Sequence, residues 1–374
     1  MAAILMMNVP YAGHTNPTLP LAEALVQHGH KVSYINAEEF RNKIECTGAE
    51  FIPYTNYPVS PTEQQKKTRC FRAAFDTAIS LEQKYDLLIY EMFFYPGIKI
   101  AEILGIPCVR QFSQPAWNQK TVSNATWFFK MSCALIDLQV MGKKNAEYMA
   151  LTKRTLIDAV LHDKPSFNIV YVPQVFQADR ESFGTDYMFT APIGKNDPAS
   201  QKIPYEEMKQ PIVYISLGSI ISNKGFCKEC IRAFGGKEMS VILNTGRVRP
   251  KTLGKIPYNI YAYSFVPQIE VLQHADVFLT HCGMNSVNEA MSFGVPMVAM
   301  PFINDQISNA KRVVALEIGK RVRSFPSSGR QLYKTVTDVC RDKHIQNRSA
   351  EVQSMLKSEA TLEEAVRRIE EILN

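Results

Sequence analysis

Short apolar segments alternate with helical patterns along the whole chain, and this alternation constrains the fold more than any other feature. In the first half, the pattern predicts strands over residues 2–8, 30–35, 86–90 and 107–111. In the second half, it predicts strands over residues 212–217, 240–244, 259–263, 277–280 and 297–300. Strands that alternate with helices form a parallel sheet covered by helices. The sequence therefore predicts an α/β protein built from Rossmann-like, doubly wound sheets.

The chain is long enough for two domains. Its 374 residues exceed what one compact core usually holds. Residues 194–210 are polar and contain two prolines, which favours a linker. We therefore expect an N-terminal domain over residues 1–200 and a C-terminal domain over residues 201–374. The last helix, over residues 360–373, is expected to pack back toward the N-terminal domain.

Charge and hydropathy narrow the classes of partner. The net charge of +6 suits an anionic ligand such as a nucleotide diphosphate, and no basic run is interleaved with aromatic residues, so nucleic acid is not an expected partner. No apolar run approaches the length of a membrane span, and the N-terminus lacks the basic region and cleavage site of a signal peptide. The eight cysteines are scattered in apolar contexts, which is typical of reduced thiols in the cytoplasm.

Several motifs of cofactor chemistry are missing. No G-x-G-x-x-G follows the first strand, no Walker phosphate loop occurs, and no Asp-x-Asp occurs anywhere in the chain. Cys227 and Cys230 form one C-x-x-C without a second pair at zinc spacing, so we interpret them as helix residues one turn apart, with a zinc or redox role as the alternative. We predict no cofactor and no metal site.

The most informative segment is DVFLTHCGMNSVNEAMSFGVPMVAMPFINDQ, over residues 276–306. A strand ends at His281, a turn follows at Gly283, and a helix begins near Asn285 and Ser286. In doubly wound sheets, ligands gather at the carboxyl ends of strands, and the N-terminus of a helix attracts anions. The segment therefore favours a nucleotide phosphate site, with Glu289 reaching a ribose.

Each element of this segment also has a structural interpretation. Ser286 and Glu289 have the spacing of a capping box, which needs no ligand. Gly283 can be a turn residue alone, and Asp305 with Gln306 can cap a loop.

Two titratable residues follow strands of the N-terminal half. His14 lies in PYAGHTNP, between the first strand and a helix expected to open at Asn16, on the ligand-facing edge beside the expected cleft. That place favours a general base, although a lone histidine is more often structural. Glu91 follows the strand DLLIY. It is either a first-turn glutamate that favours the helix dipole or a carboxylate that orients His14. We predict His14 and Glu91 as the catalytic pair.

Aromatic residues gather in loops of the N-terminal half. They can line a pocket for an apolar acceptor, or they can belong to the ordinary core. The predicted acceptor-binding residues are Tyr11, Phe93, Phe94 and Trp117.

At these residues the sequence resembles the family 1 glycosyltransferases of the UDP-glycosyltransferase superfamily, particularly their bacterial macrolide-type branch. The opening PYAGHTNPTLPLAEAL, the strand IVYISLGS, and FVPQ followed by HCGMNSVNEA and NDQ carry the resemblance. It runs along nearly the whole chain and is strongest over residues 265–306. It implies the GT-B fold, in which two Rossmann-like domains face a central cleft and the donor binds mainly to the C-terminal domain.

The resemblance also implies roles for single residues. His14 matches the base of the family, and Glu91 falls where relatives usually have Asp. Asp305 and Gln306 match residues that hold sugar hydroxyls, and Glu289 matches the ribose binder. The donor-binding positions that the resemblance implies are Ser219, Phe265, Val266, Gln268, His281, Gly283, Met284, Asn285, Ser286, Glu289, Asp305 and Gln306.

These observations together predict an inverting, metal-independent enzyme. It would move a hexose, with glucose expected, from a UDP-sugar to a hydroxyl of a small apolar or aromatic acceptor such as a polyphenol or macrolide. Three alternatives stay open: a nucleotide-sugar epimerase or hydrolase on the same fold, a non-catalytic helper protein that binds the donor, and a nucleic-acid binder.

Overall fold

A computed structural model describes residues 1–125, 127–152, 154–190, 202–218, 223–323 and 328–374. The chain divides into two compact units. Unit 1 consists of residues 1–194 and 359–374, and unit 2 consists of residues 195–358. The predicted boundary between residues 200 and 201 touches a stretch, 191–201, outside the described residues.

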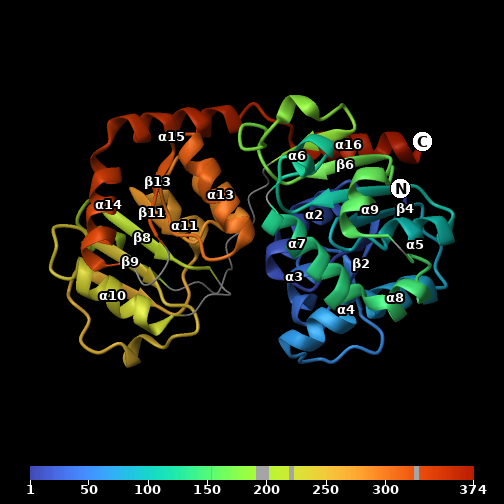
Figure 1. Cartoon of the computed structure of the whole chain (residues 1–374), viewed down its shortest axis with the longest axis horizontal. Helices are drawn as coiled ribbons and strands as arrows, with labels where there is room; N and C mark the ends of the chain where they lie inside the picture. Colours follow the sequence, from blue (N-terminus) through green and yellow to red (C-terminus); the bar gives the residue numbers. More distant parts are fainter. Residues whose placement is uncertain (126, 153, 191–201, 219–222, 324–327) are drawn as a thin grey trace. The chain divides into compact units, whose positions relative to one another are not determined.

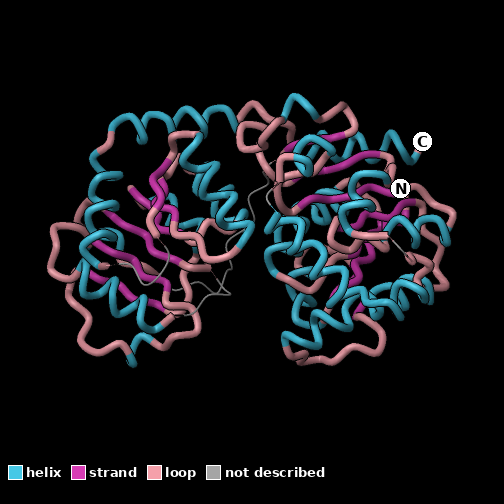
Figure 2. Tube along the Cα trace, in the orientation of Figure 1, coloured by secondary structure: helices cyan, strands magenta, loops and turns pink. Residues whose placement is uncertain are grey.

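Unit 1 contains a seven-stranded sheet in the order β3-β2-β1-β4-β5-β6-β7, and every neighbouring pair is parallel. Figure 2 shows these strands in magenta with helices around them. The strands are β1 (Ala3–Met7), β2 (Lys31–Asn36), β3 (Glu50–Pro53), β4 (Leu87–Glu91), β5 (Cys108–Phe112), β6 (Phe167–Val170) and β7 (Tyr187–Phe189).

Unit 2 repeats this architecture with a six-stranded parallel sheet in the order β10-β9-β8-β11-β12-β13. Both sheets thus share the order 3-2-1-4-5-6, counted within each unit, and the first sheet adds a seventh strand at its edge. This is the doubly wound arrangement that the alternation of patterns predicts. The strands are β8 (Ile212–Ser216), β9 (Ser240–Asn244), β10 (Ile260–Tyr263), β11 (Val277–Thr280), β12 (Met297–Ala299) and β13 (Gly319–Arg321).

Helices surround each sheet (Figure 1). In unit 1 they are α1 (Ala12–Thr15), α2 (Leu19–Gln27), α3 (Arg41–Glu45), α4 (Glu63–Ser80), α5 (Gly97–Leu104), α6 (Gln119–Ser123), α7 (Trp127–Ile136), α8 (Gly142–Tyr148), α9 (Leu156–His162) and α16 (Leu362–Leu373). In unit 2 they are α10 (Lys224–Phe234), α11 (Gln268–His274), α12 (Met284–Ser292), α13 (Asn304–Ala315), α14 (Gly329–Arg341) and α15 (Lys343–Leu356).

The central strands form because their residues are apolar on both faces. All five residues of β8 are buried, as are all five of β4 and the last four of β1. Strands covered by helices on both sides need such continuous apolar runs. The predicted strands are confirmed, with ends that differ by at most one residue. One helix start is wrong: we expected Asn16 to cap a helix, but α1 begins four residues earlier at Ala12, and a 3-10 turn over Asn16–Thr18 leads into α2.

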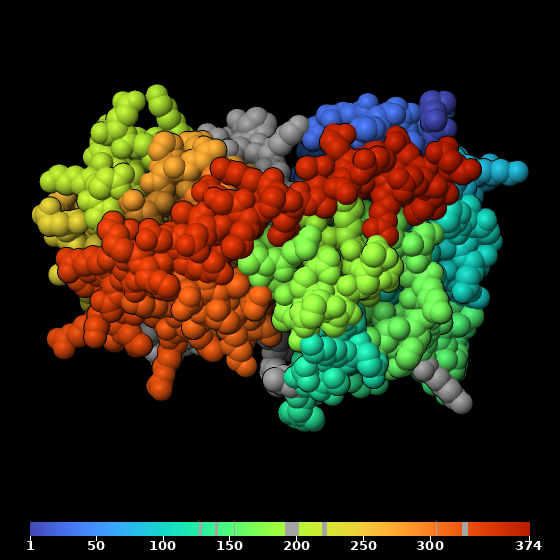
Figure 3. Space-filling model, turned by 90° about the horizontal axis from the view of Figure 1, so that it is seen from above, coloured from blue at the N-terminus to red at the C-terminus, as the bar shows by residue number. Residues whose placement is uncertain are grey.

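The last helix belongs to unit 1, although the chain reaches it from unit 2. Ala365, Val366 and Ile369 of α16 are fully buried and pack in the core cluster that contains Leu21 and Leu25 of α2. In Figure 3 the red surface of α16 lies beside the blue surface of the first part of the chain. Burial of apolar side chains therefore fixes α16 on the first sheet.

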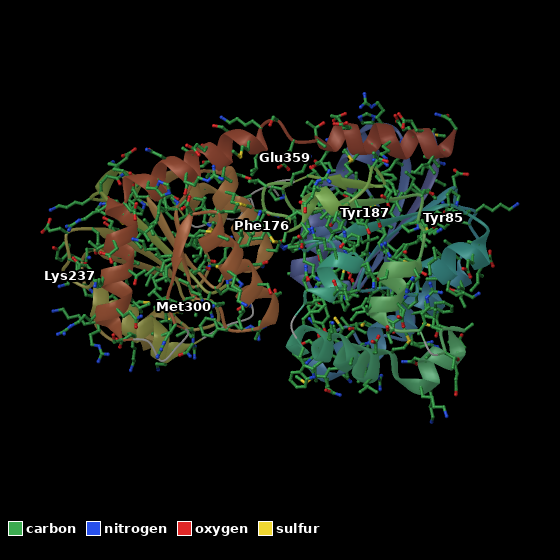
Figure 4. The ribbon with its side chains drawn as sticks, turned by 45° about the horizontal axis from the view of Figure 1, so that its top comes forward. Tyr85, Phe176, Tyr187, Lys237, Met300 and Glu359 are labelled. Carbon is green, nitrogen blue, oxygen red and sulfur yellow. The ribbon has the colours of Figure 1, made fainter. Side chains whose placement is uncertain are left out.

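The return of the chain to unit 1 is anchored at Glu359. Backbone amides of Gln174 and Val175 donate hydrogen bonds to its carboxylate, while burial raises its pKa. Figure 4 labels Glu359 near Phe176, which follows those amides in sequence. Farther along, Arg368 donates to the carbonyl oxygen of Thr185. These contacts tie the segment before α16 and the middle of α16 to unit 1.

Neither membrane spans nor disulfides occur among the described residues. No described helix combines the length and the apolar character needed to cross a bilayer.

All eight cysteines lie in described residues, and none is disulfide-bonded. Cys227 and Cys230 both lie in α10, as predicted, and are buried. Burial raises the pKa of the Cys227 thiol to about 11, which fits an inert core residue.

The packing of α16 predicts that Val366→Ala destabilises unit 1. The substitution removes two buried methyl groups, which costs about 2 kcal/mol. Both tryptophans of the chain, Trp117 and Trp127, lie in unit 1, so the urea transition followed by tryptophan fluorescence reports on that unit.

Val352→Ala in α15 is the matched control, because Val352 is equally buried and lies in unit 2. We expect Val366→Ala to lower the urea midpoint and Val352→Ala to leave it in place. Equal midpoints for Val366→Ala and the wild type would contradict this assignment of α16.

Candidate active site

The first group of predicted site residues lies where the strand order of unit 1 reverses. β1 pairs with β2 on one side and with β4 on the other, so the segments that leave β1 and β4 diverge at this edge. Ligands of doubly wound folds bind at such a switch point. His14 follows β1 within α1, and Glu91 is the last residue of β4. We call the group around them the His14 site.

His14 and Glu91 are in direct contact. Nδ1 of His14 lies 3.1 Å from Oε1 of Glu91. The Glu91 side chain is fully buried, while about a quarter of the His14 side chain is exposed. Oε2 of Glu91 accepts a hydrogen bond of 2.8 Å from the backbone amide of Phe93. The alternative interpretation of Glu91, as a glutamate in the first turn of a helix, is wrong, because the following helix, α5, starts only at Gly97.

Ser113 is a member of the His14 site that the sequence analysis missed. It directly follows β5, the strand that pairs with β4 on the side away from β1. Its Oγ lies 2.8 Å from Nδ1 of His14 and donates over 2.8 Å to Oε1 of Glu91. The available signal was its place just beyond a predicted strand, at the same sheet edge as Glu91.

Asn8 holds the backbone of the His14 site and was also missed. It follows β1 directly and is fully buried. Its Nδ2 donates over 2.9 Å to the carbonyl oxygen of His14, and its Oδ1 accepts from the amide of Val9. The short helix α1 is therefore fixed to the end of β1, which sets the direction of the His14 side chain.

Aromatic rings extend from His14 in a row. The ring of Phe93 lies 4.9 Å from that of His14, and the Trp117 ring lies 6.0 Å from Phe93. Tyr11 lies 6.3 Å from His14 on another side. Three of the four predicted acceptor-binding residues thus belong to this row. Phe94 does not, because it is fully buried with its ring 5.4 Å from that of Phe71.

The second group lies at the corresponding switch point of unit 2, where β8 pairs with both β9 and β11. His281 follows β11, and its ring lies between two glycines. A Cβ at Gly218 would come within 2.6 Å of the His281 ring, and a Cβ at Gly283 within 2.6 Å of Nε2. The backbone needs glycine at Gly218 for a second reason, its φ of +74°. We call this group the His281 site.

Burial keeps His281 neutral. It lowers the pKa of the imidazole to about 4. Nδ1 of His281 is buried without a hydrogen-bond partner among the described residues. A buried polar atom of this kind normally has a partner, so the site has an unused hydrogen-bonding group.

Helix α12 starts beside His281. Gly283 is the residue before its first turn, and no side chain caps the helix there. The first amide groups of a helix have no acceptor within it, so their N–H groups, from Met284 to Ser286, make this end attractive to an anion. The capping-box interpretation is wrong. The helix starts at Met284, so Ser286 lies inside its first turn, whereas a cap residue precedes the helix.

The side chains of Ser286 and Glu289 instead meet Gln268 at the start of α11. Nε2 of Gln268 donates over 3.1 Å to Oγ of Ser286 and over 2.6 Å to Oε2 of Glu289. Oε1 of Gln268 accepts over 3.0 Å from the hydroxyl of Tyr214, which the sequence analysis did not select. Burial raises the pKa of Glu289 to about 7, against the hydrogen bond from Gln268, which lowers it.

The remaining donor positions are of several kinds. Phe265 is 58% exposed, whereas the adjacent Val266 is buried. Asp305 is exposed in the first turn of α13. Gln306 is 3% exposed, and its Oε1 accepts from the amides of Phe302 and Ile303. The oxygen of Gln306, which the resemblance assigns to a sugar hydroxyl, is therefore already engaged in that loop.

Two further results complete the site. Ser219 lies outside the described residues. Among the residues that the structure describes, no three His, Cys, Asp or Glu side chains gather closely enough to hold a metal ion.

Known proteins resemble this chain over its whole length. NDP-glycosyltransferase YjiC of Bacillus subtilis strain 168 is 31% identical, covering 98% of this chain and 96% of its own. Oleandomycin glycosyltransferase of Streptomyces antibioticus is 24% identical, and the match covers 99% of this chain and 90% of that protein. The crystal structure of the glycotransferase of kitacinnamycin has a TM-score of 0.82 and 26% identity, covering 100% of this chain and 99% of its own.

Residues 188–372 match the family described as "UDP-glucoronosyl and UDP-glucosyl transferase". The whole-length relative with 31% identity extends this match to the His14 site. The two parallel Rossmann-like sheets agree with the GT-B fold of the solved relative. The chain is therefore a glycosyltransferase that belongs to family 1, in its bacterial macrolide-type branch.

Proposed function

We propose that this glycosyltransferase transfers a hexose, with glucose preferred, from a UDP-sugar to a hydroxyl of a small apolar or aromatic acceptor, with inversion and without a metal ion. The observation that carries the proposal is the contact between His14 and the fully buried carboxylate of Glu91 at the switch point of unit 1. A histidine oriented through Nδ1 by a carboxylate is a general base at Nε2.

In the proposed reaction, Nε2 of His14 takes the proton of the acceptor hydroxyl. The acceptor oxygen attacks the anomeric carbon, and the bond from that carbon to the diphosphate breaks with its electron pair on the leaving oxygen. Attack from the face opposite the leaving group inverts the anomeric centre. Glu91 acts through His14, because its carboxylate stabilises the imidazolium that forms.

The His281 site is the proposed place of the donor diphosphate. The amide groups at the start of α12 and Nδ1 of His281, which has no partner among the described residues, supply hydrogen-bond donors for the developing negative charge. Such donors can act without a metal ion, and the chain has no Asp-x-Asp segment. Glu289 is proposed to accept hydrogen bonds from the ribose hydroxyls, and the exposed Phe265 to lie against the uracil.

The proposed acceptor class follows from the aromatic row. The rings of Tyr11 and Phe93 lie beside His14, and the buried Trp117 packs against Phe93. Such surfaces favour flat or apolar acceptors such as polyphenols and macrolides. The relative from Streptomyces antibioticus is named for oleandomycin, and the Bacillus subtilis relative for an NDP-sugar.

The cytoplasm remains the proposed compartment. Seven of the eight cysteines are buried or half-buried and none is disulfide-bonded, which suits a reducing environment.

We predict that His14→Ala lowers kcat on an alcohol acceptor by about 10²- to 10⁴-fold, the usual contribution of a general base. The affinity for UDP, measured by calorimetry, should stay near that of the wild type, because His14 belongs to unit 1 and the diphosphate site to unit 2. A strongly acidic phenol is the internal control, since it needs little help from a base. Wild-type turnover of the alcohol would refute the base assignment.

We also predict that activity survives EDTA. The positive end of α12 and the hydrogen-bond donors of the His281 site replace a divalent cation at the leaving diphosphate. The measurement is the initial rate of product formation, by mass spectrometry, before and after dialysis against chelator. Complete loss in EDTA with recovery on adding Mg²⁺ or Mn²⁺ would show the opposite.

The donor preference can be tested by competition. At equal concentrations of UDP-glucose, UDP-galactose, UDP-GlcNAc and TDP-glucose, we expect UDP-glucose to give most of the product. A carboxylate built to accept from two ribose hydroxyls discriminates against a donor that lacks one, because a polar group is then left unpaired.

Glu289→Gln should therefore bring the amounts of product formed from UDP-glucose and from TDP-glucose closer together. The substitution keeps the shape of the side chain but removes its charge. Preference of the wild type for TDP-glucose would overturn the Glu289 argument. Preference for UDP-GlcNAc would overturn the proposed role of Asp305 at the sugar. Gln306 contributes less to this argument, because its oxygen is engaged by the amides of Phe302 and Ile303.

A further inference from the structure

Three polar atoms of the His14 site form a closed triangle. Nδ1 of His14 lies 2.8 Å from Oγ of Ser113 and 3.1 Å from Oε1 of Glu91, and Oγ of Ser113 lies 2.8 Å from the same Oε1. Ser113 and Glu91 are both buried, with 3% and 0% of their surfaces exposed. Water therefore does not compete for these three contacts.

The protons of the triangle can be assigned from chemistry. A carboxylate only accepts hydrogen bonds, and a serine hydroxyl has one proton to donate. The Ser113 hydroxyl donates to Oε1 of Glu91, so its oxygen is left as an acceptor toward His14. If Nδ1 of His14 carried no proton, its lone pair would face two oxygen acceptors. The tautomer with a proton on Nδ1 satisfies all three atoms.

We propose that Ser113 is a positioning residue of the transfer reaction, whose hydroxyl joins Nδ1 of His14 to the Glu91 carboxylate and so holds the tautomer that leaves Nε2 free to act as the base. This inference rests on the proposed role of His14. It adds a third member, from a third strand end, to the pair that the sequence predicted. It also accounts for how a glutamate can orient His14 at a position where the family resemblance implies an aspartate.

Glu91 carries one methylene more than aspartate, and therefore one more torsion angle to fix. Its two carboxylate oxygens have separate anchors: Oε2 accepts from the amide of Phe93, and Oε1 accepts from Ser113. Without Ser113, one end of the carboxylate would keep only its contact with His14. The hydroxyl thus fixes both the carboxylate and the imidazole.

The proton count of the step is unchanged by Ser113. The acceptor hydroxyl gives its proton to Nε2 of His14, the acceptor oxygen bonds to the anomeric carbon, and the nucleotide diphosphate leaves with the electron pair of the broken bond. Ser113 keeps its own proton throughout. The imidazolium continues to donate from Nδ1 to Oγ of Ser113 and to Glu91.

The kinetic test compares Ser113→Ala with Ser113→Thr and Ser33→Ala. Loss of one hydrogen bond at a charged group lowers a rate by about 10- to 100-fold. We expect that loss in kcat of Ser113→Ala on an alcohol acceptor, little change in KM, and a clearly smaller loss on an acidic phenol. Ser113→Thr, which keeps the hydroxyl, should recover most of kcat.

Ser33→Ala is the matched control. Ser33 is also a buried serine of unit 1 that donates to a glutamate, over 2.7 Å to Glu50, but it lies in β2 away from His14. Its kcat should stay within about two-fold of the wild type, a change of less than 0.5 kcal/mol. Equal loss on both acceptors in Ser113→Ala would indicate a merely structural role and would overturn the proposal.

A direct measurement on the unaltered enzyme completes the test. With ¹⁵N-labelled histidine, nitrogen chemical shifts report which ring nitrogen of each of the seven histidines carries the proton. The His14 signal is assigned by its absence in His14→Gln. At a pH where the imidazole is neutral, we expect a proton on Nδ1 in the wild type and a mixture of tautomers in Ser113→Ala.

The outcomes separate this inference from the proposed function. A wild-type His14 with its proton on Nε2 would overturn the proposal, whether or not Ser113→Ala folds. Wild-type kcat in Ser113→Ala, with His14→Ala inactive, would overturn the role of Ser113 alone. An active His14→Ala would overturn the base assignment itself.

Discussion

The burial of the Glu91 carboxylate is the interaction on which the His14 site depends. A carboxylate removed from water is stable only if its oxygens are hydrogen-bonded. Glu91 is fully buried and has partners in His14, Ser113 and the amide of Phe93. These partners come from the segments after β1, β5 and β4. The position of His14, the proposed base, is thus fixed by contacts at the edge of the sheet.

Parallel strand order brings those segments together. β1, β4 and β5 are adjacent and parallel, so their carboxyl ends meet at one edge although the residues are 99 positions apart at most. The same order in unit 2 brings Gly218, after β8, against His281, after β11. One topology therefore builds the His14 site in the first unit and the His281 site in the second, and the residues at the strand ends decide which chemistry is proposed for each.

Much of this arrangement could be predicted from the sequence, because long apolar runs and glycine turns give strong signals. The two sheets, the contact of His14 with Glu91, and the cluster of Gln268 with Ser286 and Glu289 all lie in predicted positions. The missed parts have weak local signals. Ser113 is one serine after a strand, and only the order of β4 and β5 brings it to Glu91. The inward turn of Gln306 depends on the amides of a loop whose shape the sequence does not reveal.

Burial has opposite effects on the pKa values of His281 and Glu289, the two titratable groups considered in the His281 site. It lowers the pKa of His281 to about 4 and raises that of Glu289 to about 7, so at neutral pH the imidazole is uncharged and the carboxyl group is only partly ionised. The positive potential there comes from the amide groups at the start of α12. Because partial protonation of Glu289 reduces its repulsion of a diphosphate, the proposed ribose contact and the proposed phosphate contact can lie on one short helix. A lysine in place of His281 would add charge but would lose the flat ring that fits between Gly218 and Gly283.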